Sequence, residues 1–169
     1  EAAGLPGHLR DDANDAVIDA GLVADQLADG LDFLLGDEEA LRCFRFMNRV
    51  MADQRIYTQV ADARSRDPRL SRTAARTAVL SDGPKAYSWR TFQLAFVLMQ
   101  LRALVEPALP RRSGDLAKVE LLFFPTGGGK TEAYLGLAAF AFAIRRRQGV
   151  VESADGPLDG RSGVAVLMR

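Results

Sequence analysis

The residues best suited to chemistry form a glycine-rich turn that follows an apolar run and ends in a lysine and a threonine. The turn is Pro125-Thr126-Gly127-Gly128-Gly129-Lys130-Thr131-Glu132. Glycines let several backbone N–H groups converge on one anion, and a helix that begins here adds its positive N-terminal end. We expect all eight residues to bind ATP, with Lys130 as the catalytic residue at the β- and γ-phosphates. Thr131 is the expected Mg²⁺ ligand, and Glu132 is expected to support the loop.

The turn departs from the general phosphate-loop pattern at one position. Phe124 stands where that pattern has its first glycine, whereas Gly129, Lys130 and Thr131 fit it. An alternative interpretation is a glycine-rich connection between a strand and a helix, with a lysine that has no role in binding.

A second candidate group lies at the start of a predicted helix, where Arg90 precedes Gln93 by three residues. The carboxamide of Gln93 can pair with the N6 and N7 edge of adenine through two hydrogen bonds. We therefore expect Arg90 and Gln93 to bind the nucleotide and Gln93 to select adenine. The alternative is that Gln93 is a helix-start residue exposed to water.

These motifs resemble those of a known protein class. The segment 125–131 resembles motif I of superfamily 2 helicases, and Trp89-Arg90-Thr91-Phe92-Gln93 is similar to their Q motif. The longer segment 124–140 resembles the DrmA family, the helicase-like subunit of the bacterial DISARM anti-phage system, and the resemblance extends over about residues 88–169. It implies an ATP-dependent DNA helicase or translocase that acts on DNA with a second, DrmB-like subunit.

The resemblance and the apolar pattern together predict an α/β fold. We expect a helical N-terminal extension over residues 1–80, followed over residues 81–169 by the first part of a RecA-like ATP-binding lobe with a parallel sheet. The expected crossover unit is a strand over 119–124, a helix over 131–147 and a strand over 164–168, with loops between them.

The N-terminal region is predicted to be helical and divided by charge. Residues 11–39 carry ten carboxylates and neither lysine nor arginine, whereas the helix predicted over 38–64 is basic. We expect the two to dock through Arg42, Arg45, Arg49 and Arg55, although these arginines could instead contact a nucleic-acid backbone. Residues 64–80 are predicted to form a loop or a short exposed helix. The helix predicted over 89–105 is apolar on all sides and therefore buried.

Composition narrows the remaining possibilities. The net charge is zero, and the single cysteine, Cys43, lies in an apolar helical stripe, which favours a core role and a reducing, cytoplasmic location. His8 has no Cys or His neighbours that could complete a metal site, and no run is long enough to span a bilayer.

An acidic motif II and an arginine finger are missing, so we expect this segment alone to be inactive. Two rival functions are a P-loop phosphotransferase and a non-catalytic nucleotide-binding module.

Overall fold

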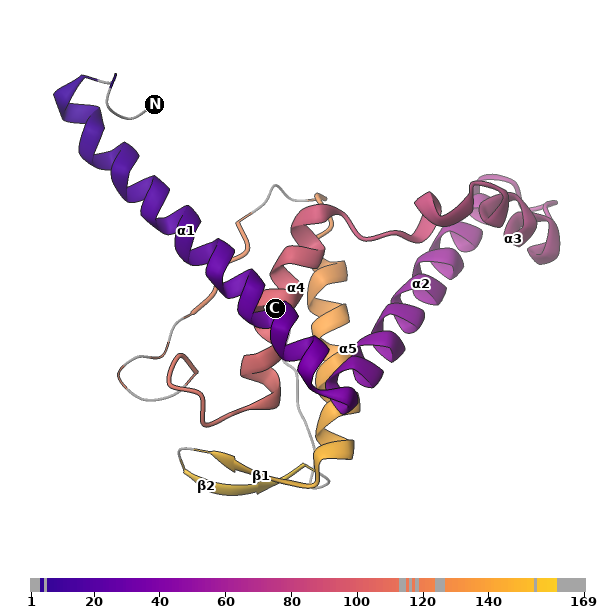
Figure 1. The fold of residues 1–169 in the computed structure, drawn as a ribbon. Coiled ribbons are helices and arrows are strands. Elements are labelled where there is room, and N and C mark those ends of the chain that lie inside the picture. The colour runs from indigo at the N-terminus through magenta and orange to yellow at the C-terminus, as the bar shows by residue number, and fades with distance from the viewer. Residues whose placement is uncertain are drawn as a thin grey trace.

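The structure is a computed structural model that describes residues 4, 6–112, 115, 117, 119–123, 127–153 and 155–160. Within these residues the chain is mostly helical (Figure 1). The elements are α1 (Gly7–Gly36), α2 (Glu38–Arg66), α3 (Arg72–Ser81), the 3-10 helix η2 (Gly83–Tyr87), α4 (Thr91–Val105), α5 (Lys130–Gln148), β1 (Val150–Ser153) and β2 (Gly156–Asp159).

Local sequence signals explain where the N-terminal helices begin and end. Asp37 is extended, which ends α1, and its carboxylate accepts a hydrogen bond of 2.9 Å from the backbone N–H of Ala40, which caps α2. Ser71 caps α3 in the same way. The acidic stretch therefore lies mostly in one continuous helix, and the region predicted as a loop or short helix contains the ten-residue α3.

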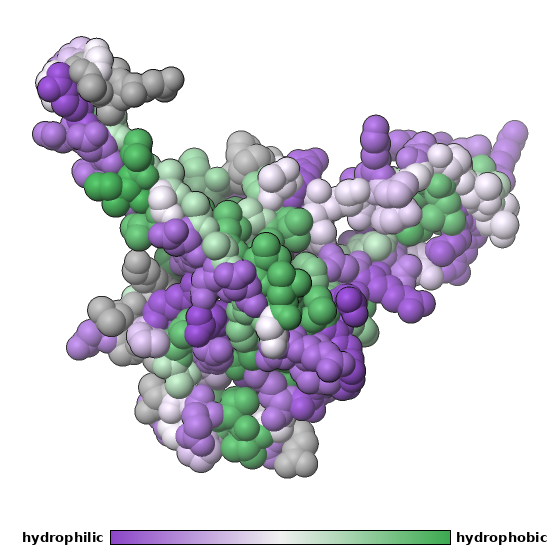
Figure 2. All heavy atoms as spheres, viewed as in Figure 1, coloured by the Kyte–Doolittle hydropathy of each residue, from purple (hydrophilic) through white to green (hydrophobic). Residues whose placement is uncertain are grey.

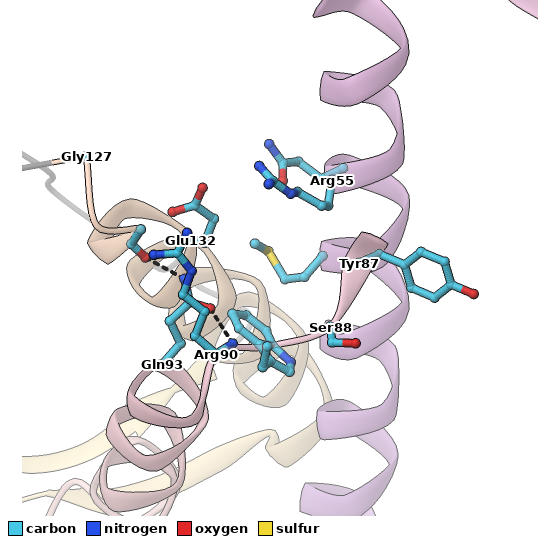
Figure 3. Close-up of a pocket in the computed structure, with 11 residues that line it drawn as sticks. Arg55, Tyr87, Ser88, Arg90, Gln93, Gly127 and Glu132 are labelled. Atoms are coloured by element: carbon cyan, nitrogen blue, oxygen red, sulfur yellow. Dashed lines mark hydrogen bonds between the residues drawn. The ribbon is translucent and has the colours of Figure 1, made fainter. Parts of the chain in front are cut away.

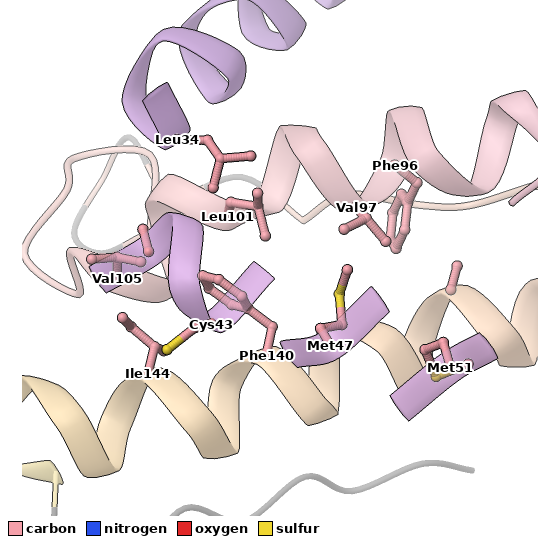
Figure 4. Packing of buried hydrophobic residues seen from close by; sticks show 12 residues of the cluster. Leu34, Cys43, Met47, Met51, Phe96, Val97, Leu101, Val105, Phe140 and Ile144 are labelled. Atoms are coloured by element: carbon pink, nitrogen blue, oxygen red, sulfur yellow. The ribbon is translucent and has the colours of Figure 1, made fainter. Parts of the chain in front are cut away.

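The main core lies between α2, α4 and α5, as Figure 4 shows. Cys43 and Met47 of α2 meet Val97 and Leu101 of α4 and Phe140 of α5, and all five side chains are at most 1% exposed. Burial raises the pKa of the Cys43 thiol, which favours its neutral form. The predicted core role of Cys43 and the predicted burial of α4 are both confirmed.

Helix α1 packs on α4 only through its C-terminal part. Gly30 is buried there, and a Cβ atom at this position would overlap the backbone carbonyl oxygen of Leu98. The N-terminal part of α1 projects beyond the helical core (Figure 1), and its apolar side chains Val17, Ile18 and Leu22 are more than half exposed (green patches in Figure 2). The contact between α1 and α4 therefore depends on a glycine at the crossing point.

Replacing Gly30 by alanine should separate α1 from α4. The backbone of Leu98 must shift to admit the methyl group, and we expect a loss of about 1–3 kcal/mol in the free energy of unfolding. Gly21→Ala is the matched control, because a Cβ atom at position 21 meets nothing within 4 Å and alanine favours the helix by roughly 0.5–1 kcal/mol. Urea titration of both variants is the measurement, and equal stabilities would contradict close packing at Gly30.

The predicted α/β fold with a parallel sheet and a RecA-like lobe is wrong for the described residues. Their sheet has two strands, β1 and β2, which pair antiparallel within a segment predicted to be a loop. Residues 119–123, expected to form a central strand, have no strand partner, and the side chains of Val119, Leu121 and Phe123 are 95%, 81% and 89% exposed. The second expected strand, 164–168, lies outside the described residues.

The physical reason for this correction is that a strand exists only with hydrogen-bonded neighbours. An apolar run such as 119–123 has strand propensity, but propensity alone does not provide a partner. The apolar surface of α5 is buried instead against α2 and α4. The boundary predicted near residue 81 stays a prediction, although the main core draws residues from both sides of it.

The predicted docking of the acidic helix onto the arginines of α2 is largely wrong. Arg42 pairs with Glu38 and Glu39 at the start of its own helix, and Asp29 of α1 pairs with Arg102 of α4 at 2.5 Å. Among the described residues, Arg45, Arg49 and Arg55 form no ion pair within 4 Å. The cause is geometric, because α1 packs mainly against α4 rather than α2.

Glu39 also pairs with Arg147, which links the start of α2 to the end of α5. The hydrogen bond from Arg147 lowers the pKa of Glu39, so the link adds stability when the carboxylate is ionised and loses it as the pH falls through that lowered pKa.

We expect Glu39→Gln to melt slightly below the wild type at neutral pH and to match it in strong acid. Glu38→Gln, which does not touch Arg147, should show a smaller change in thermal scans across pH. A difference independent of pH would contradict this role of the link.

Candidate functional site

The glycine-rich turn directly precedes α5, as predicted. Gly127 and Gly129 have φ angles of 80° and 95°, in the left-handed region that favours glycine. Lys130 is the first residue of α5, one residue earlier than expected. The predicted binding residues Pro125 and Thr126 lie outside the described residues.

Two side chains at the start of α4 hold this turn by its backbone carbonyls, and the bond from Gln93 to Gly129 is one of the two dashed lines in Figure 3. The Nε2 of Gln93 donates to the carbonyl oxygen of Gly129 at 2.7 Å, and the Nη1 of Arg90 donates to that of Gly128, also at 2.7 Å. The Oε1 of Gln93 accepts from the backbone N–H of Arg90 at 2.8 Å, which caps α4. Arg90 and Gln93, which the sequence suggested as a pair, are thus brought to the predicted phosphate loop.

The environment of Gln93 assigns its side chain a structural role in this conformation. The residue is only 5% exposed, and both ends of its carboxamide have partners within the protein. A Cβ atom at position 129 would lie 2.7 Å from the Nε2 of Gln93, so side-chain packing as well as the φ angle restricts this position to glycine. The predicted reading of adenine by Gln93 stays a prediction.

Lys130 and Thr131 lie where an anion would meet the N-terminal end of α5. Lys130 is half-buried and Thr131 is exposed. In the described part of the chain, no carboxylate lies within 4 Å of the Lys130 amine, so its charge is not neutralised there. The same part contains no cluster of three or more His, Cys, Asp or Glu side chains that could hold a metal ion. A cation bound here would therefore depend on Thr131 together with the ligand's own oxygens.

A cavity of about 210 Å³ adjoins the turn and separates it from α2. Gly127, Gly129 and Glu132 form one side, together with Arg90 and Gln93. The other side is formed by Met51, Gln54, Arg55, Tyr87, Ser88 and Trp89. This second side could not be predicted from the sequence, because helical periodicity shows which residues share a face but not what that face meets.

Three contacts attach η2 and the segment that follows it to α2 and α5, and so position the cavity. The Nε1 of Trp89 donates to the Oδ1 of Asn48 at 2.6 Å, and the Nε2 of Gln59 donates to the carbonyl oxygen of Ala86 at 2.7 Å. The indole ring also covers Gly136 of α5, where a Cβ atom would lie 2.8 Å from it. Helices α2 and α5 therefore hold the two sides of the cavity at a fixed separation.

Comparison with known proteins gives one informative match. The chain is similar to DISARM protein DrmA. That protein, from Bacillus paralicheniformis (strain ATCC 9945a / NCIMB 11709 / CD-2), is 38% identical over 143 residues, which are 83% of this chain and 11% of DrmA. No protein-family model and no solved structure matches the chain. The predicted relation to DrmA is confirmed, whereas membership of the helicase superfamily stays a prediction.

Among the described residues, no helix combines the length and the apolar character needed to cross a bilayer.

Loss of the Gln93 side chain should loosen the turn and destabilise the protein. Gln93→Ala removes hydrogen bonds to Gly129 and Arg90 from a buried site, and we expect a cost of about 1–3 kcal/mol in the free energy of unfolding. Gln100→Ala is the control on the same helix, because the Nε2 of Gln100 is buried with no hydrogen-bond partner. Denaturant unfolding compares the two, and a Gln93 variant as stable as the control would show that these bonds contribute nothing.

Proposed function

We propose that the glycine-rich turn and the first residues of α5 bind the triphosphate of ATP together with Mg²⁺. The observation that carries the proposal is the turn itself, with left-handed Gly127 and Gly129 held from outside by Gln93 and Arg90. Because these bonds use the carbonyl oxygens of the turn, its N–H groups remain the groups suited to an anion. Lys130 follows at the positive end of a 19-residue helix.

In this proposal each side chain has one role. Lys130 brings positive charge to the β- and γ-phosphates, where negative charge accumulates during phosphoryl transfer. The hydroxyl of Thr131 is the protein ligand for Mg²⁺, and the metal would neutralise phosphate charge. Glu132 supports the turn, and Arg90 and Gln93 position it, so catalysis depends mainly on positioning and electrostatics.

We further propose that the chain supplies ATP binding to an ATP-dependent DNA helicase or translocase that acts in the cytoplasm in DISARM-type anti-phage defence. Its similarity to DrmA supports this role. DNA and a second, DrmB-like subunit are the proposed partners. The aligned segment is 11% of DrmA, so DNA translocation itself is a property proposed for the longer protein. A phosphotransferase, the rival function, would require an acceptor site beside the phosphates, and none has been assigned among the described residues.

Lys130→Ala tests this function in the longer protein, because the present segment alone is expected to be inactive. Removing the cation from the phosphate site should weaken ATP binding and lower the rate of ATP hydrolysis by about a hundredfold or more, while the fold is retained. Lys85→Ala is the matched control, because Lys85 is exposed on η2 and does not line the cavity. ATP affinity and phosphate release, with and without DNA, are the measurements.

Two results would count against the proposal. ATP turnover at the wild-type rate in the Lys130 variant would show that the phosphates do not bind at Lys130. Transfer of phosphate to a small molecule, with no response to DNA, would favour the phosphotransferase.

A further inference from the structure

The cavity beside the glycine-rich turn is too small to enclose a whole nucleotide. Its volume is about 210 Å³, whereas pockets that enclose a drug-sized ligand typically measure about 300–1,000 Å³. Lys130 and Thr131, the residues proposed to bind phosphate and Mg²⁺, are not among its lining residues, although Gly127 and Gly129 are. The cavity therefore lies next to the phosphate site, on the side of the turn that faces α2.

The side of the cavity opposite the turn is suited to a flat, partly apolar group. Met51 and Trp89 supply apolar surface, whereas the ring of Tyr87 points away from the turn (Figure 3) and packs against the cluster that joins α2 to α3. The guanidinium of Arg55 can stack on a π-system or donate hydrogen bonds. The Nε2 of Gln54 donates to the hydroxyl of Thr58 at 3.1 Å, which leaves its second N–H and its amide oxygen for a ligand. A purine base offers a flat face and a polar edge that match this set.

Arg55 is the cation of α2 that is placed to use this cavity. It extends from α2 toward the side of the cavity that carries Glu132 (Figure 3), and it is exposed rather than packed in the core. Within the described residues no carboxylate lies within 4 Å of its guanidinium. Arg45 and Arg49, on the same helix, do not line the cavity.

We propose that this cavity receives the purine base of the bound nucleotide, with Arg55 against the base and Gln54 at its polar edge. The inference rests on the proposed ATP site and extends it to a helix outside the recognised motifs. Gln93 then acts as a positioning residue, because its carboxamide is engaged by Gly129 and Arg90. In this proposal the base is selected by Gln54 of α2 rather than by Gln93, because the Gln54 amide complements the N6 and N7 edge of adenine.

The affinities for ATP and for inorganic tripolyphosphate are compared, because only ATP carries the base and both carry the phosphates. In the full chain, Arg55→Ala should weaken ATP binding roughly three- to tenfold and leave tripolyphosphate binding unchanged, as expected for loss of a stacked guanidinium. Gln54→Ala should reduce the preference for ATP over GTP. Gln93→Ala should weaken both nucleotides equally, because it loosens the turn that binds their common triphosphate.

The controls distinguish failure of this inference from failure of the proposed function. Arg49→Ala, on the same helix but outside the cavity, should change no affinity, and thermal unfolding should show that Arg55→Ala is folded. Lys130→Ala should weaken ATP and tripolyphosphate together.

Each remaining outcome contradicts a stated part of the proposal. If Arg55→Ala weakens both probes equally, the guanidinium contacts the phosphates and the placement of the base is wrong. If it weakens neither while Lys130→Ala weakens both, the cavity is not used and only this inference fails. If the wild-type chain binds neither probe, the ATP site fails and the base site fails with it.

Discussion

The hydrogen bond from the Gln93 carboxamide to the carbonyl oxygen of Gly129 is the contact on which the candidate site depends. It joins the start of α4 to the turn before α5, across 36 residues of sequence. The turn needs left-handed backbone angles at two glycines, and such a backbone has little order of its own because glycine loses the most conformational entropy on folding. A buried amide that binds the turn at one end and caps α4 at the other offsets part of that cost.

Helix α2 takes part in both the core and the site. Its first half supplies Cys43 and Met47 to the main core, and Met51, Gln54 and Arg55 follow on the side of the cavity. A smaller cluster of Ile56, Val60, Ala75 and Val79 then joins its second half to α3. The N-terminal helices are therefore part of the structure around the turn rather than an appendage to it.

Much of the local structure could be predicted from the sequence, because its causes are local. Asp37 followed by two glutamates marks the start of α2, and a glycine-rich turn followed by Lys130 marks the start of α5. The sheet could not be predicted, since an apolar run forms a strand only when a partner lies beside it, and residues 119–123 have none among the described residues. The hairpin of β1 and β2 formed instead in a polar segment, where Ser153 and Gly156 make the turn.

The same distinction applies to the site. The types of Arg90 and Gln93 and their spacing indicated that they act together, and the structure brings both to the turn. The spacing of residues in the sequence does not show which way their polar groups point, so it does not show what those groups bind. The position of Arg55 beside the cavity could not be predicted either, because which of the six arginines on α2 lies there depends on how the helix is rotated against its neighbours.

The form of α2 has a structural consequence. The helix is a rod of 29 residues anchored in the core by its first half and attached to α3 at its far end. Measured from Cys43, Arg55 lies about 18 Å along the rod and Arg66 about 35 Å, at about 1.5 Å per residue. The cluster that joins α2 to α3 begins at Ile56, the residue after Arg55, so α2 passes from the main core to the cavity and then to a second, smaller core without a break in the helix.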